Sequence, residues 1–228
     1  MKRSEINCAI AWAKALLEKH SITLPPFAYF TMDNWAKNAK AAQDEIFAAG
    51  LGWDVTDYGQ HRFSQLGAVL FTVRNGVADK PRIGAPYAEK YIILSAGQFL
   101  PCHCHRVKTE DIINRAGGIM RVQLWNSLPE GGLDPVSDVS FSLDGMTATV
   151  KAGEAFDLHP GSSLRMAPGI YHIFGAAAEG GDLVCGEVSS INDDVTDNYF
   201  TEQYPRFTTI EEDEAPLHPL CNEYTKLF

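Results

Sequence analysis

The chain of 228 residues lacks the features of a membrane or nucleic-acid-binding protein. It has no run of about 18 apolar residues, so no transmembrane helix is predicted. Basic residues are few, 19 against 29 acidic ones, and the formal net charge is −10. Because phosphate binding requires a basic face, this charge excludes nucleic acid as a partner and disfavours anionic membranes. We therefore expect the partners to be small molecules or a second copy of the chain.

Cysteines are also few and irregularly spaced, at Cys8, Cys102, Cys104, Cys185 and Cys221. An odd, scattered set favours reduced thiols over a disulfide framework. The N-terminal residues reach an acidic side chain at Glu5 and do not resemble a secretory leader. No glycine-rich nucleotide loop is present, so no nicotinamide or phosphate site is indicated. These absences predict a cytoplasmic protein.

The first fifty residues are predicted to be helical. Apolar side chains recur at helical spacing at Ile6, Ile10, Ala13 and Leu17. Asp33 is expected to cap a second helix that ends at Gly50. Neither helix carries catalytic residues at a useful spacing, so residues 1–50 are expected to be a cover packed on another structure.

From about residue 65 the pattern changes to short strands and tight turns. Strands are predicted around 69–73, 91–94, 119–125, 140–143 and 146–150, with turns at Asn75-Gly76 and Asp144-Gly145. Short strands without intervening helices predict a sandwich or barrel. We assign residues 65–190 to this barrel and residues 191–228 to a polar tail that wraps it, within a single domain of residues 1–228. The acidic run at 211–214 is expected to be a solvated face.

Two histidines, His103 and His105, are the most informative feature of the chain. Side chains at i and i+2 of a strand share a face, so both imidazoles are predicted to point the same way. By the same alternation Cys102 and Cys104 point the other way, which favours small packing groups over zinc ligands. Glu110 lies shortly beyond the pair and supplies a carboxylate.

A third histidine, His172, follows the turn Pro168-Gly169. Three imidazoles and one carboxylate suit a divalent cation and leave coordination positions open, which is the arrangement of a catalytic site. His159 also lies beside a Pro-Gly turn and is the alternative to His172. These ligand types suit manganese, zinc, iron and cobalt alike.

The spacing G-x5-H-x-H-x4-E-x6-G, from Gly97 to Gly117, resembles the first motif of the cupin superfamily at every fixed position. Pro168-Gly169 with His172 is similar to the second motif, although Ala176 stands where the family often has asparagine. The resemblance implies a mainly β fold, a cupin-type barrel or jelly roll with the N-terminal helices as its cover. It also implies that one divalent metal ion is held by His103, His105, Glu110 and His172.

Over nearly its full length the chain resembles the D-lyxose isomerases, cupin sugar isomerases of bacteria. The resemblance rests on the helical N-terminus, the segment 103–110, and the tail segments 193–198, 210–214 and 221–224. It implies isomerisation of free D-lyxose with D-xylulose, and of D-mannose with D-fructose. It further implies Mn²⁺ as the metal and a homodimer as the assembly. A neutral sugar agrees with the lack of an arginine cluster that would clamp a phosphate.

Aldose–ketose isomerisation needs a metal that holds O1 and O2 and, on the route through a cis-enediol, a base near C1 and C2. Lys108 lies two residues before Glu110 and is expected to share its face on a strand. Glu202 lies in a tail segment that must cover an apolar surface to bury Phe200. We predict Lys108 and Glu202 as the proton carriers, and prefer Glu202 to Glu187.

Three residues are predicted to contact the sugar. Lys90 precedes a strand and projects toward the barrel mouth, and Gln123 is expected to face inward from the middle of its strand. Phe200 supplies an apolar contact from the tail. Other functions stay open: a ferrous dioxygenase with the same ligands, a non-catalytic sugar-binding cupin, or a metal-free structural barrel. The residues also leave open a direct hydride shift.

Overall fold

The computed structural model describes residues 1–193, 196–205 and 207–227, so Asp194 and Val195 of the tail motif lie outside the described residues. The helical segments are α1 (Arg3–Lys19), the 3-10 helix η1 (Pro26–Tyr29), α2 (Met32–Ala42), the π-helix η2 (Gln43–Phe47) and α3 (Tyr224–Leu227). The strands are β1 (Gly52–Thr56), β2 (Ala68–Gly76), β3 (Gly84–Leu94), β4 (His103–Cys104), β5 (Glu110–Gly117), β6 (Met120–Ser127), β7 (Leu133–Asp134), β8 (Val139–Leu143), β9 (Met146–Val150), β10 (Phe156–Leu158), β11 (Ser163–Met166), β12 (Ile170–Ala176), β13 (Leu183–Ser190) and β14 (Tyr199–Phe200).

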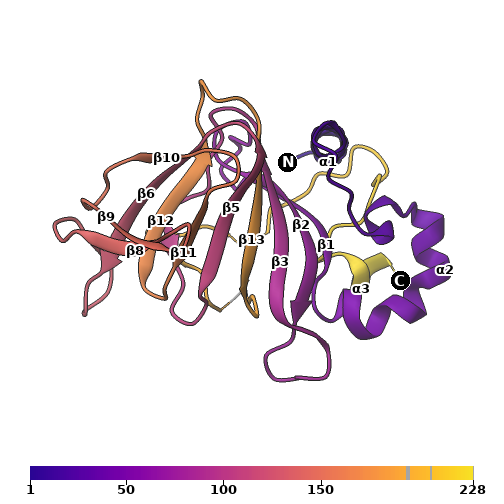
Figure 1. Ribbon diagram of the computed structural model, residues 1–228. Helices are drawn as coiled ribbons and strands as arrows, with labels where there is room; N and C mark the ends of the chain where they lie inside the picture. The colour runs from indigo at the N-terminus through magenta and orange to yellow at the C-terminus, as the bar shows by residue number, and fades with distance from the viewer. Residues whose placement is uncertain (194–195, 206, 228) are drawn as a thin grey trace.

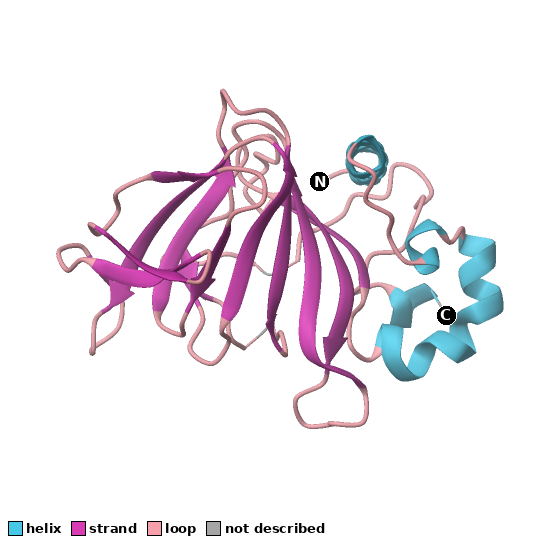
Figure 2. Cartoon of the chain, viewed as in Figure 1, coloured by secondary structure: helices cyan, strands magenta, loops and turns pink. Residues whose placement is uncertain are grey.

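These strands form two antiparallel sheets that curl toward each other (Figure 1). The larger has the order β1-β2-β3-β13-β5-β11-β8-β9, and the smaller has the order β10-β6-β12-β4-β14, with β7 beside β6. The helices gather at the β1 side of the larger sheet, and strands make up the rest (Figure 2). The predicted mainly β, cupin-like architecture with an N-terminal helical cover is confirmed.

Alternate side chains of the two sheets fill the space between them. Ile92 and Ile112 of the larger sheet belong to the same buried cluster as Leu124 and Phe174 of the smaller one, and each is at most 3% exposed. Full burial of such a side chain stabilises the fold by about 1.5–3 kcal/mol. Every second side chain of a strand faces this space, because side chains alternate between the two faces of a sheet. Polar residues at such inward positions can therefore form a site.

The N-terminal helix packs on the outer face of β1, β2 and β3. Its predicted apolar stripe is buried as expected, and it meets a second buried cluster with members such as Trp53, Phe71 and Ile93. The second helix begins two residues earlier than predicted, because the hydroxyl of Thr31, and not Asp33, caps it by accepting a hydrogen bond from the Asn34 amide at 3.2 Å.

The tail after residue 208 runs along the start of α1. Arg3 is 1% exposed, and its guanidinium pairs with Glu212 and with the buried Glu223. Ser4 donates to Asp213 from both its amide and its hydroxyl, at 2.9 and 2.7 Å. The acidic run is exposed, as expected, but it also binds the N-terminal helix, where carboxylates are favoured by the helix dipole.

Two strand predictions need correction. Asn75-Gly76 is not a turn, because β2 continues through Gly76 and the chain reverses at 77–83. The Asn75 amide instead donates to the carbonyl oxygens of Ala49 and Asn192. The strand β1 was not predicted either. The turn at Asp144-Gly145 is confirmed, with φ of 49° and 82° at the two positions.

Other expectations concern the chain as a whole. All five cysteines lie in the described residues and are free. No helix in the described part of the chain combines the length and the apolar character that a membrane crossing requires.

Candidate metal centre

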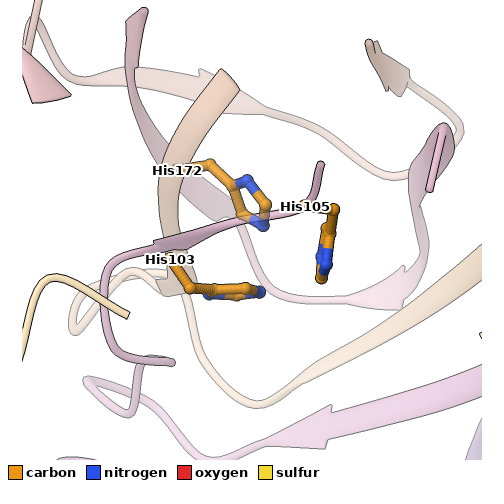
Figure 3. A group of neighbouring side chains, drawn as sticks. All are labelled: His103, His105 and His172. Carbon is orange, nitrogen blue, oxygen red and sulfur yellow. The ribbon is translucent and has the colours of Figure 1, made fainter. Parts of the chain in front are cut away.

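Three histidines meet where β4 pairs with β12 (Figure 3). His103 on β4 is directly paired with His172 on β12, and His105 lies just beyond β4. One ring nitrogen from each lies within 4.8 Å of the others. All three residues are buried, with exposed fractions of 8%, 4% and 1% for His103, His105 and His172.

Hydrogen bonds on the far side of each ring determine which nitrogen is available. The Nδ1 atoms of His103, His105 and His172 lie 2.8, 2.8 and 3.1 Å from backbone carbonyl oxygens. A carbonyl only accepts, so each Nδ1 carries the proton and each neutral ring keeps its lone pair on Nε2. This arrangement orients the histidines that ligate metals in proteins.

Glu110 completes the group from the first residue of β5. Its Oε1 lies 3.4 Å from Nε2 of His105 and 3.3 Å from Nε2 of His172. Within the described part of the chain, these three buried atoms have no hydrogen-bond partner. An unsatisfied buried polar atom costs about 1–3 kcal/mol. The three atoms are the Nε2 atoms of His105 and His172 and the Oε1 atom of Glu110, and they lie close together. Two imidazole nitrogens and a carboxylate oxygen fit a divalent cation.

Burial and charge keep these groups in the forms that bind metal. Burial lowers the pKa of His172 to about 4 and that of His103 well below its ordinary value. Burial alone would raise the pKa of Glu110, but the Lys108 ammonium holds it well below its usual range. The site therefore combines the neutral imidazoles of His103 and His172 with an ionised carboxylate at neutral pH.

The route by which His105 and Lys108 reach the site differs from the prediction. The strand ends at Cys104, and residues 105–109 form a loop instead of continuing the alternation. Asp197 holds this loop: its carboxylate accepts hydrogen bonds from the amides of Arg106, Val107 and Lys108. Its carbonyl oxygen is the partner of His105 Nδ1. Sequence analysis did not identify this role, although Asp197 lies in the tail segment that carries the family resemblance.

A chain of buried charges extends from Glu110 into the larger sheet. The Lys108 ammonium lies 2.9 Å from Glu110 Oε2 and 2.9 Å from Glu187 Oε1, and Lys90 Nζ lies 3.8 Å from the same Glu187 oxygen. Burial works to raise the pKa of Glu187, but Lys108 and Lys90 bring it below its usual value. Glu187, which was predicted to be a weaker candidate than Glu202, is thus an ionised carboxylate one side chain away from Glu110.

The cavity next to the histidines measures about 40 Å³. Its lining includes the predicted residues Lys90, Lys108 and Phe200, together with Glu187. The Phe200 ring packs against the ring of His103, with centroids 5.4 Å apart. A further wall residue that was not predicted is Tyr58, whose ring lies 5.8 Å from that of Phe200.

Three predicted residues are not brought to this cavity. Gln123 lies on the opposite face of β6 from its buried neighbours and donates to the Gly153 carbonyl oxygen at 2.8 Å. Glu202 is exposed and accepts a hydrogen bond from the Tyr204 hydroxyl at 3.0 Å. His159 is exposed in the turn after β10, and the three-histidine group contains His172 in its place.

Comparison with known proteins relates the chain to one sequence family. The family model described as D-lyxose isomerase matches residues 1–224. A protein of Escherichia coli O157:H7 named D-lyxose/D-mannose isomerase is 42% identical over 98% of both chains. A protein of Serratia proteamaculans with the same name is 39% identical over 99% of both chains.

Solved structures agree on the fold. The L-ribose isomerase of Cellulomonas parahominis with L-psicose superposes with a TM-score of 0.58 at 18% identity, covering 92% of this chain and 98% of that one. The L-ribose isomerase of Geodermatophilus obscurus gives a TM-score of 0.56 at 18% identity and the same coverage. At these identities the likeness establishes the cupin-like fold alone.

Proposed function

The chain belongs to the D-lyxose isomerase family, and from this we propose that it is a metal-dependent isomerase of free D-lyxose with D-xylulose and of D-mannose with D-fructose. The names of its relatives support this choice of sugars. The observation that carries the metal dependence is the set of buried, unpartnered ligand atoms on His105, His172 and Glu110.

We propose His103, His105, Glu110 and His172 as the ligands of one Mn²⁺ ion. A divalent cation bound there would supply Lewis acidity, which polarises the sugar carbonyl and makes the hydrogen on the neighbouring carbon more acidic. The donor set also suits zinc, iron and cobalt, so the choice of manganese rests on the family resemblance. The homodimer expected from the same resemblance is part of the proposal, as is a cytoplasmic location, which the free cysteines support.

The proton transfer is proposed for two buried side chains. Glu187, ionised beside two ammonium groups, takes the proton from C2 of the aldose, and the electron pair of that bond forms the C1–C2 double bond of a cis-enediol. Lys108 donates a hydrogen bond to the oxygen on which negative charge develops. Transfer of the hydroxyl proton from O2 to O1, together with return of the proton from Glu187 to C1, yields the ketose. The 2.9 Å contact between the two side chains supports the assignment, because it places acid and base together.

The alternative carrier, Glu202, stays a prediction from the sequence. It requires the exposed carboxylate to reach the sugar from the tail, where it now bonds to Tyr204. The two assignments differ in a measurable way. If Glu202 carries the proton, Glu202→Ala abolishes turnover while the metal stays bound.

The function is tested by assaying metal-stripped protein with D-lyxose and D-mannose, with and without Mn²⁺. Ketose formation that depends on Mn²⁺ is the expected result. Bound metal without turnover on either sugar would instead indicate a binding protein. Oxygen uptake with Fe²⁺ would indicate a dioxygenase.

A further inference from the structure

A second cavity, of about 510 Å³, lies beside the metal cavity. Among the described residues, Leu70 of β2 and Lys90 of β3 line both cavities. The rest of its lining comes from residues 47–50, the β2–β3 hairpin, residues 191–193 and the C-terminal segment near 221. These two side chains are therefore part of a wall that the two cavities share.

The register of the larger sheet explains this arrangement. Thr72 is paired with Lys90, and Lys90 is paired with Glu187. Directly paired residues of neighbouring strands project to the same face of a sheet. Of these three paired residues, Thr72 lines the second cavity and Glu187 lines the metal cavity. Lys90 lies between them and lines both.

The adjacent inward row has the same order. Asp54 is paired with Leu70, and Leu70 is paired with Ile92. Asp54 lines the second cavity and Ile92 the metal cavity, with Leu70 between them. Neighbouring strands lie about 4.8 Å apart, so each row spans about 10 Å across three strands. Both cavities thus lie side by side on one face of the sheet.

The metal cavity leaves little room beside the ligands. Its 40 Å³ has room for about three water molecules. A sugar whose C1 and C2 lie at the ligands must extend away from them, and its carbon chain then meets a wall of the cavity. Leu70 is the apolar member of the wall that faces the second cavity, and loss of its side chain would join the two spaces.

We propose that the second cavity is a subsite for the end of the sugar remote from C1, and that Leu70 limits how far a sugar chain enters it. The inference rests on the proposed isomerase function. The ligand class is the hydroxyl-bearing carbon chain of a neutral aldose or ketose. Asp54 and Thr72 line the subsite with a carboxylate and a hydroxyl, which match sugar hydroxyls as acceptor and as donor or acceptor. Phe47 and Phe207 add apolar surface.

The test compares a six-carbon with a five-carbon substrate. Leu70→Ala should raise the ratio of kcat/KM for D-mannose over that for D-lyxose by about tenfold, the effect of a single carbon group in a pocket. Leu70→Ile, which keeps the volume, should keep the wild-type ratio. Leu70→Ala combined with Thr72→Leu, which narrows the second cavity beside residue 70, should return the ratio toward the wild-type value. Leu70→Val replaces the alanine variant if that variant does not fold.

The outcomes separate this inference from the function on which it rests. An unchanged ratio in Leu70→Ala, or a raised ratio that persists in the double variant, would overturn the subsite. A wild-type protein that turns over neither sugar would overturn the isomerase function instead. In that case calorimetric binding of D-mannose and D-lyxose to the wild type and Leu70→Ala decides the subsite by the same ratio.

Discussion

Replacement of Glu187 by glutamine removes one negative charge from the row of buried charged side chains that joins Glu110 to Lys90. It keeps the shape of the side chain. The glutamine oxygen can still accept the hydrogen bond that Lys108 now donates over 2.9 Å, so the local packing should survive. What is lost is the base itself. A positioned general base contributes about 10²–10⁴-fold to the rate, and we expect kcat for D-lyxose to fall by that factor.

The assay measures kcat at saturating sugar and Mn²⁺, together with the metal bound per chain. Bound metal should not change, because Glu187 is not among the proposed ligands. Glu89→Gln is the matched control: Glu89 neighbours Lys90 on β3 but pairs with Arg74, a partly exposed side chain, and its loss should leave kcat unchanged. If Glu187→Gln keeps more than about a tenth of the wild-type kcat with full metal, Glu187 is not the base. Loss of turnover in Glu202→Ala, with metal retained, would then support the sequence-based assignment.

Three further predictions concern the parts of the chain that support the site. Arg3→Ala should lower the free energy of unfolding in urea by about 3–5 kcal/mol, since it leaves Glu223 buried without its cation; a loss below about 1 kcal/mol would contradict this. Asp197→Ala should weaken Mn²⁺ binding by about 10–100-fold, because Asp197 orders the loop that carries His105, and an unchanged affinity in a Mn²⁺ titration would refute that role. His218 has its pKa lowered by burial, so only the unfolded chain takes up its proton just below pH 6.5. Its contribution to stability is therefore complete above that pH and is lost as the pH falls through the lower folded pKa, and the melting temperature of His218→Gln should depend less steeply on pH in this range.

Much of the fold could be predicted because its signals are local. The helical stripe of α1 and the Asp144-Gly145 hairpin depend on residues close in sequence, and both are confirmed. Asn75-Gly76 has the same local turn signal, yet it lies inside β2, because distant segments at Ala49 and Asn192 bind the Asn75 side chain. Long-range hydrogen bonds of this kind leave no mark in a short window of sequence.

The grouping of His103, His105, Glu110 and His172 was predictable for a similar reason, since their spacing forms a motif. The residues around them were not. Glu187 reaches the site through cross-strand pairing with Lys90, and Asp197 reaches it from 92 positions beyond His105. Gln123 shows the opposite error: a polar residue in mid-strand was expected to face inward, but Val122 and Leu124 occupy the inward positions. The alternation of inward and outward side chains along β6 was predicted correctly, but Gln123 was assigned to the wrong face.

The most direct test of the account is one titration of metal-free protein with Mn²⁺, in which bound metal and D-lyxose turnover are measured on the same samples. Bound metal and turnover are expected to rise together and to saturate at one equivalent per chain, and the double variant His105→Ala with His172→Ala should lose both. Turnover that is complete before metal binds, or that is unaffected by loss of these two histidines, would contradict it.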